Sequence, residues 1–240
     1  MDKPILLKAT DVIVGYQKPL TSEINFNCYS GELICVLGPN GTGKSTLFKS
    51  IAGLVSPLSG SIDLLGKSIK EYSLKERAQN LTTVFMAHLL IPEMTVREYV
   101  SLGRTPYAGF LDARSEVDIL AIQKALEDTR LTDFAERPMY ALSDGERSRV
   151  FIARALAQEV KVLLLDEPTA FLDVPNTLFL FDLLKKIVRT KNNTLFLSTH
   201  NVDYAKRFAD RILAFDGKGH VSLMDVKTAF ESDFLQWIHG

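Results

Sequence analysis

The segment that most constrains the fold of this chain is Gly38–Ser45, which reads GPNGTGKS and follows an apolar stretch. The stretch Glu32–Gly38 is typical of a strand buried on both faces, and the TLFKSIA that follows Ser45 favours a helix. The pattern G-x-x-x-x-G-K-[ST] between a strand and a helix predicts a loop whose backbone N–H groups surround phosphates. A chain of average composition contains this pattern by chance less than about one time in a hundred, which disfavours a simple strand-to-helix turn.

Residue types within this loop predict its ligands. Glycines let the backbone fold around phosphates, Lys44 is expected to contact the outer phosphates, and the Ser45 hydroxyl is expected to bind Mg²⁺. The residues expected to contact a nucleotide are Gly38, Pro39, Asn40, Gly41, Thr42, Gly43, Lys44, Ser45 and Thr46.

A second apolar strand ends in two acids. Four apolar residues, Val162–Leu165, precede Asp166 and Glu167. Asp166 is expected to hold a metal ion through water, and Glu167 to orient and deprotonate an attacking water molecule. Such a pair can also be an ordinary solvated strand end, but its position after a phosphate loop favours the catalytic interpretation.

The remaining pattern predicts an α/β fold. Apolar strands at 161–165 and 194–198 flank an amphipathic helix at about 175–190, which indicates a mostly parallel core sheet. Alternating segments before residue 30 and at 59–66 predict an antiparallel β subdomain, and residues 90–158 predict an inserted α-helical subdomain with a loop around Gly103, Pro106 and Gly109. A hairpin at 212–224 around Asp216 and a helix over about the last 15 residues complete the prediction.

Composition excludes several classes of protein. The 240 residues are 46% hydrophobic and 24% charged, which excludes a disordered or fibrous chain, and the net charge of -1 disfavours a nucleic-acid partner. The two cysteines, Cys28 and Cys35, fit small core residues in a reducing compartment. No apolar run is long enough for a membrane span or a signal peptide, so we expect a soluble, cytosolic protein.

The segment ALSDGER at 141–147 resembles the LSGGQ signature of the ABC transporter ATPases. LLLDEPTAFLD at 163–173 and LSTH at 197–200 also resemble motifs of that family, in the same order and spacing, so the resemblance covers essentially the whole chain. It implies a single ABC ATPase domain over 1–240 with a P-loop (RecA-like) core, which uses ATP and Mg²⁺.

The signature segment also has a physical interpretation of its own. Ser143 followed three residues later by Glu146 is a capping box, and a helix N-terminus with an exposed serine and Gly145 suits phosphate. In the family this end faces the γ-phosphate held by a second subunit, which implies a head-to-tail dimer. Asp144 and Glu146 stand where the family usually has Gly and Gln, and would repel a triphosphate unless turned away.

The resemblance assigns roles to three further residues. Tyr16 lies where an aromatic ring stacks on adenine, with an ordinary strand-end tyrosine as the less favoured alternative. Asp173 matches an acid that crosses the dimer interface, and His200 matches a histidine that contacts the γ-phosphate.

One family position is not matched. The glutamine that normally ligates Mg²⁺ after the next strand is replaced by Met86 or its neighbour Ala87. A thioether is a poor ligand for Mg²⁺, so the metal is expected to keep an extra water and hydrolysis or its coupling to be weaker.

Residues 95–107, TVREYVSLGRTPY, are similar to importer ATPases for iron–siderophore, haem and cobalamin. This similarity implies integral membrane permease subunits as partners and a place on the cytoplasmic face of the inner membrane. Thr95 and Glu98 form a second capping box, so the segment could also be a generic helix start. A non-transport ABC switch and a P-loop small-molecule kinase remain alternatives on the sequence alone.

Overall fold

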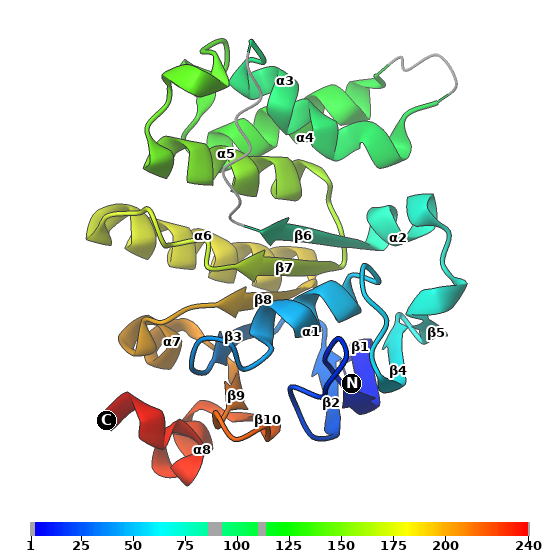
Figure 1. Ribbon diagram of the computed structural model, residues 1–240. Helices are drawn as coiled ribbons and strands as arrows, with labels where there is room; N and C mark the ends of the chain where they lie inside the picture. The colour runs from blue at the N-terminus through cyan, green and yellow to red at the C-terminus, as the bar shows by residue number, and fades with distance from the viewer. Residues whose placement is uncertain (1–2, 86–92, 110–113, 240) are drawn as a thin grey trace.

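The computed structural model describes residues 3–85, 93–109 and 114–239, and its centre is a six-stranded sheet (Figure 1). The strand order is β10-β9-β3-β8-β7-β6, and all neighbours are parallel except β10, which pairs antiparallel with β9. The strands are β3 (Leu33–Leu37), β6 (Leu81–Phe85), β7 (Val162–Asp166), β8 (Thr194–Ser198), β9 (Arg211–Phe215) and β10 (Val221–Asp225). The mostly parallel core and the hairpin of β9 and β10 are confirmed.

An antiparallel sheet of four strands lies against this core in the order β2-β1-β4-β5. Its strands are β1 (Ile5–Ile13), β2 (Ile24–Tyr29), β4 (Ser59–Leu64) and β5 (Lys67–Ser68). The Phe196 ring of β8 lies 6.2 Å from that of Phe26 in β2 and 6.3 Å from that of Phe48 in the helix after the phosphate loop. The predicted antiparallel β subdomain is therefore confirmed.

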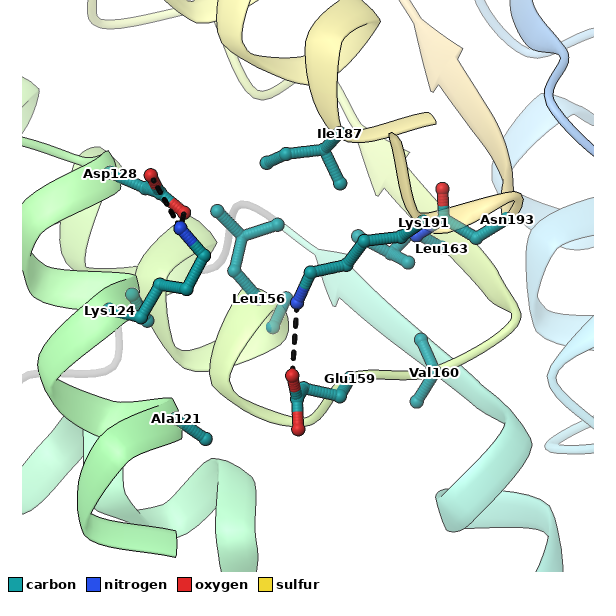
Figure 2. Close-up of a pocket in the computed structure, with 12 residues that line it drawn as sticks. Ala121, Lys124, Asp128, Leu156, Glu159, Val160, Leu163, Ile187, Lys191 and Asn193 are labelled. Atoms are coloured by element: carbon teal, nitrogen blue, oxygen red, sulfur yellow. Dashed lines mark hydrogen bonds and ion pairs between the residues drawn. The ribbon is translucent and has the colours of Figure 1, made fainter. Parts of the chain in front are cut away.

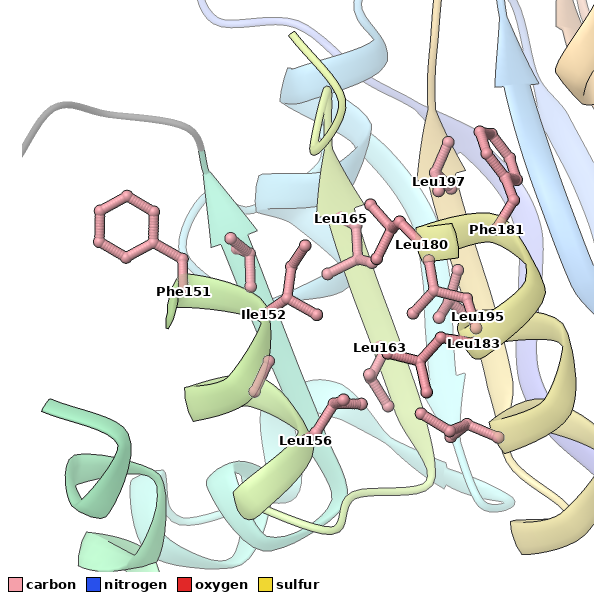
Figure 3. Packing of buried hydrophobic residues seen from close by; sticks show 14 of the residues in the cluster. Phe151, Ile152, Leu156, Leu163, Leu165, Leu180, Phe181, Leu183, Leu195 and Leu197 are labelled. Carbon is pink, nitrogen blue, oxygen red and sulfur yellow. The ribbon is translucent and has the colours of Figure 1, made fainter. Parts of the chain in front are cut away.

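Side chains of the central strands alternate between two hydrophobic cores, because neighbours on a strand point to opposite faces. Leu33, Cys35 and Leu37 belong to one core, and Ile34 and Val36 to the other. Figure 3 shows the first core, where Leu163 and Leu165 of β7 meet side chains of two helices, Ile152 and Leu156 from one and Leu180 and Leu183 from the other. Burial on both faces explains why these strands are continuously apolar.

The helices are α1 (Lys44–Ile51), α2 (Leu74–Asn80), α3 (Val96–Ser101), α4 (Glu116–Asp128), α5 (Asp144–Ala157), α6 (Val174–Lys191), α7 (Val202–Phe208) and α8 (Val226–Glu231). Helices α3, α4 and α5 contact one another and lie beyond the β6 edge of the sheet, as the predicted helical subdomain requires (Figure 1). Both predicted capping boxes are present, at Thr95 and at Ser143. Over residues 3–85, 93–109 and 114–239, no helix has the length and apolar character needed to cross a membrane.

Two predicted elements differ from the structure. Residues Leu102–Tyr107 form a 3₁₀ helix rather than a loop, and Gly103 packs so closely on α5 that an added Cβ would lie 2.3 Å from the carbonyl oxygen of Arg154. The single terminal helix is wrong, because α8 ends at the extended residue Ser232 and a 3₁₀ segment, Asp233–His239, follows. The Ser232 hydroxyl donates to the carbonyl of Ala229 and so competes with continuation of the helix. Strand β6 was expected only from the family resemblance, and α2 was not predicted.

Candidate nucleotide-binding site

The predicted phosphate loop joins the carboxyl end of β3 to the first turn of α1. Gly38 is buried, and Gly43 caps α1 with φ of +106°, a left-handed value that favours glycine. Thr42 closes the loop through a hydrogen bond of 2.9 Å from its hydroxyl to the carbonyl of Pro39. Asn40, Gly41 and Ser45 are exposed, whereas Thr46 is buried in the helix.

Lys44 lies across the mouth of this loop. Its Nζ donates hydrogen bonds to the carbonyl oxygens of Gly38 at 2.6 Å and Pro39 at 2.8 Å, and the residue is only 6% exposed. Burial lowers the pKa of Lys44, while the carboxylates of Glu167 and Asp166 act in the opposite direction. The ammonium group therefore lies in a weakly solvated position, in the electrostatic field of both strand-end acids.

Asp166, the last residue of β7, and Glu167, which follows it, are positioned by the neighbouring strand β8. Asp166 pairs in register with Ser198, whose hydroxyl donates to Asp166 Oδ1 at 2.6 Å. The same hydroxyl accepts a hydrogen bond of 2.8 Å from the backbone N–H of Glu167. Glu167 adopts φ of +53°, and its Oε1 lies 2.7 Å from His200 Nε2. The structure thus brings Asp166, Glu167 and His200 together.

Ser198 is the residue of this cluster to which the sequence analysis assigned no role. The sequence feature that could have identified Ser198 is its position as the last residue of an apolar strand, two residues before His200. Because one hydroxyl orients Asp166 and the backbone of Glu167, we expect Ser198→Ala to lower the ATP hydrolysis rate about tenfold at saturating ATP. ATP affinity, measured by calorimetry, should change by less than about threefold. An unchanged hydrolysis rate would contradict this role, and Ser222→Ala on β10 is the control.

Ser143 and Gly145 lie at the N-terminus of the capped helix α5. Ser143 is exposed, and an added Cβ on Gly145 would lie 3.1 Å from the carbonyl oxygen of Phe171 in the loop after β7. Two residues further on, Asp173 caps α6 by accepting a hydrogen bond of 2.9 Å from the backbone N–H of Asn176. The α5 N-terminus therefore lies beside the loop that leads to Asp173.

Both unusual acids of the signature segment have partners within their own helix. Asp144 forms an ion pair with Arg147. Glu146 Oε2 accepts hydrogen bonds of 2.8 Å from both the backbone N–H and the hydroxyl of Ser143. The backbone hydrogen bond from Ser143 is the main reason that the pKa of Glu146 is lowered. Both carboxylates are therefore engaged by groups in the first turn of α5.

In a single chain, the phosphate loop and Ser143 belong to helices on opposite faces of the central sheet. The side chains of α1 pack in one core and those of α5 in the other. The phosphate loop and Ser143 are therefore attached to helices that cover opposite faces of the sheet.

The remaining predicted positions are Tyr16 and the place of the missing glutamine, Met86 or Ala87. Tyr16 is 58% exposed in the segment after β1, near the isolated bridge between Gly15 and Pro19. Met86 and Ala87 lie outside the described residues; Phe85, the last residue of β6, is the register partner of Asp166.

The fit of a divalent cation can be judged from the available donors. Among the described residues, no group of three or more His, Cys, Asp or Glu side chains is arranged to hold a metal. Ser45 and Asp166 supply hard oxygen donors of the kind that Mg²⁺ prefers, and Mg²⁺ usually binds through few protein ligands together with phosphate oxygens and water. The residues therefore fit a magnesium ion that arrives with a nucleotide.

A groove lies at the ends of β7 and β8, and a second, smaller hollow lies elsewhere. A groove of about 250 Å³ borders Glu167 and His200 and is lined also by Thr169, Thr177 and Tyr204. The hollow of about 20 Å³ in Figure 2 lies between α4, the end of α5 and α6, and contains the ion pair of Lys191 with Glu159 at 3.0 Å. None of the predicted site residues lines this second hollow, so it carries no part of the proposed chemistry.

A phosphate loop after the first core strand, with acids at the end of a nearby parallel strand, defines a P-loop nucleoside triphosphatase. Residues 21–170 match the family profile described as ABC transporter. The chain belongs to this family: it binds ATP and is an ATPase.

Two curated relatives illustrate the similarity. The chain is 35% identical to the achromobactin transport ATP-binding protein CbrD of Dickeya dadantii, over 95% of this chain and 88% of the relative. It is 37% identical to the petrobactin import ATP-binding protein FpuD of Bacillus anthracis, over 83% of this chain and 73% of the relative.

Solved structures agree with this assignment. A dimeric ATP-binding cassette, MJ0796, in a post-hydrolysis state with bound ADP and phosphate is 29% identical, with a TM-score of 0.81, over 92% of this chain and 99% of that one. A metal-chelate type ABC transporter in an inward-facing conformation is 27% identical, also with a TM-score of 0.81, over 97% of this chain and 88% of that one.

Proposed function

We propose that this chain is the Mg²⁺-dependent ATPase subunit of a membrane importer for a metal chelate of the iron–siderophore, haem or cobalamin type. The observation that carries the hydrolytic part is the cluster of Asp166, Glu167, Ser198 and His200, at the same end of the sheet as the phosphate loop that follows β3. The importer part is supported by relatives that transport achromobactin and petrobactin. The partners are permease subunits rather than nucleic acid, which places the chain on the cytoplasmic face of the inner membrane.

In this proposal, the loop residues Gly38–Thr46 hold the phosphates through backbone N–H groups, and Tyr16 stacks on the adenine. Lys44 exchanges the carbonyls of Gly38 and Pro39 for phosphate oxygens. Ser45 binds Mg²⁺ directly and Asp166 holds it through water. When bound, Mg²⁺ would neutralise charge that develops on the phosphates.

Glu167 has the central chemical role. Its carboxylate orients the attacking water and accepts its proton. His200 holds that carboxylate at 2.7 Å and can reach the γ-phosphate, while Ser198 fixes the Glu167 backbone. The water attacks the γ-phosphorus in line while the bond to the oxygen of the β-phosphate breaks, so that phosphate forms and ADP leaves. Lys44 with the loop N–H groups stabilises the charge on the transferred group.

Residues 1–240 act as one ATPase domain, with the helices of about 90–158 as its inserted subdomain. Two copies pair head to tail, so that Ser143 and Gly145 of one copy meet the γ-phosphate on the other and Asp173 crosses the interface. The placement of α1 and α5 on opposite sheet faces supports this pairing.

Purification from membranes tests the importer assignment. A tagged chain extracted in mild detergent should bring with it integral membrane proteins in a defined ratio, identified by mass spectrometry. The control is the same tagged chain expressed in cells that lack its native membranes. Recovery without any membrane protein, or transfer of phosphate to an acceptor other than water in a single-turnover assay, would overturn the proposal.

A further inference from the structure

The turn between β9 and β10 contacts the phosphate loop on one side. Phe215, the last residue of β9, lies against Gly38 so closely that an added Cβ on Gly38 would be 2.5 Å from the Phe215 Cβ. In the turn itself, Gly217 has φ of +81°, and an added Cβ there would lie 3.2 Å from the ring of Pro39. The first two residues of the phosphate loop therefore rest on this hairpin.

The same turn binds the segment that carries Tyr16. The carbonyl of Gly219 accepts two hydrogen bonds from Ser22, at 2.7 Å from its backbone N–H and 3.2 Å from its hydroxyl. Ser22 follows Thr21, whose hydroxyl accepts a hydrogen bond of 3.2 Å from the N–H of Val14. Residues 14–22 are thus closed into a compact segment with Tyr16 exposed on it.

Residues 14–22, which carry Tyr16, also contact the far end of the phosphate loop. An added Cβ on Gly43 would lie 3.4 Å from Leu20 and from Val14. These contacts form a closed circuit. The start of the phosphate loop contacts the β9–β10 turn, the turn contacts residues 14–22, and residues 14–22 contact the end of the phosphate loop.

Asp216 fixes the shape of the turn. Its Oδ1 accepts hydrogen bonds from the backbone N–H groups of Lys218 at 2.7 Å and His220 at 2.9 Å, and its Oδ2 lies 2.7 Å from His220 Nδ1. These bonds fix the turn, and with it the contact of Gly217 with Pro39 and the hydrogen bonds from Ser22 to Gly219.

We propose that the Asp216–His220 turn is a positioning element of the nucleotide site, which sets the separation between Tyr16 and the phosphate loop that ATP must span. Asp216 is its positioning residue. This inference rests on the proposed function, since it takes Tyr16 as the adenine contact.

The test compares two ligands of different length by calorimetry in Mg²⁺ buffer. Asp216→Ala should weaken ATP binding about tenfold, whereas inorganic triphosphate, which reaches only the phosphate loop, should lose less than twofold. Asp216→Asn keeps an acceptor for the two backbone N–H groups and should restore most of the ATP affinity. Lys227→Ala, an exposed change on α8 outside this turn, is the control and should leave both ligands unaffected.

Equal loss of ATP and triphosphate would overturn the inference, because the turn would then support the phosphate loop alone, and so would no loss of either. If Asp216→Ala does not fold by circular dichroism, Ser22→Ala removes one link to Gly219 and should weaken ATP about two- to threefold while sparing triphosphate. Failure of the unmutated chain to bind ATP would instead overturn the proposed function.

Discussion

Replacing Glu167 with glutamine is expected to lower ATP hydrolysis at least about a hundredfold while ATP still binds. The amide is nearly the same size and can keep a hydrogen bond to His200, but it cannot accept the proton of the attacking water. Phosphate release at saturating ATP measures the loss, and calorimetry measures the retained affinity. With ATP bound and not hydrolysed, the variant should also elute as a dimer in size-exclusion chromatography.

The matched control is Glu231→Gln, the same chemical change at an exposed position on α8. It should hydrolyse ATP at the unmutated rate and remain monomeric under the same conditions as the unmutated chain. Hydrolysis by Glu167→Gln at the unmutated rate would show that another group takes the proton. A variant that binds ATP and stays monomeric would count against the head-to-tail pairing instead.

Lys44→Ala should weaken ATP binding about 10- to 100-fold and leave little hydrolysis, because a charge-assisted contact to phosphate is lost. The folded chain should tolerate the change. Burial lowers the pKa of Lys44, which means that folding disfavours its charged form, so removing the ammonium relieves that cost. The free energy of unfolding, measured in urea at neutral pH, should change by less than about 1 kcal/mol.

Lys49→Ala removes a cation from the last turn of the same helix and serves as the control. Its effect on ATP affinity should be less than about threefold, since it lies five residues, or about 7.5 Å along the helix axis, beyond Lys44. Equal losses in the two variants would mean that Lys44 acts through the general charge of α1 rather than through contact with phosphate.

Local residue patterns predicted much of the fold correctly. The continuous apolar runs of β3, β7 and β8 indicated strands covered on both faces, and two hydrophobic cores cover them. Ser143 with Glu146 predicted a capping box, which the structure contains. These features depend on residues within a few positions of one another, so the sequence alone carries them.

Other features depended on contacts between distant segments. The 3₁₀ helix at Leu102–Tyr107 packs against α5, about fifty residues further along the chain. The role of Ser198 required β7 and β8 to be in register, which brings its hydroxyl to Asp166. Pairing and packing of this kind leave no periodic signal.

The sequence by itself determined that a phosphate loop would join a buried strand to a helix, because glycines, Lys44 and Ser45 impose that turn on any α/β core. Only the tertiary structure decided which groups surround the loop. Parallel pairing carries the ends of β7 and β8 to Lys44, and the β9–β10 turn links Pro39 to the segment of Tyr16. Side chains more than a hundred residues apart meet there because strand order in the sheet, rather than order along the chain, sets their distance.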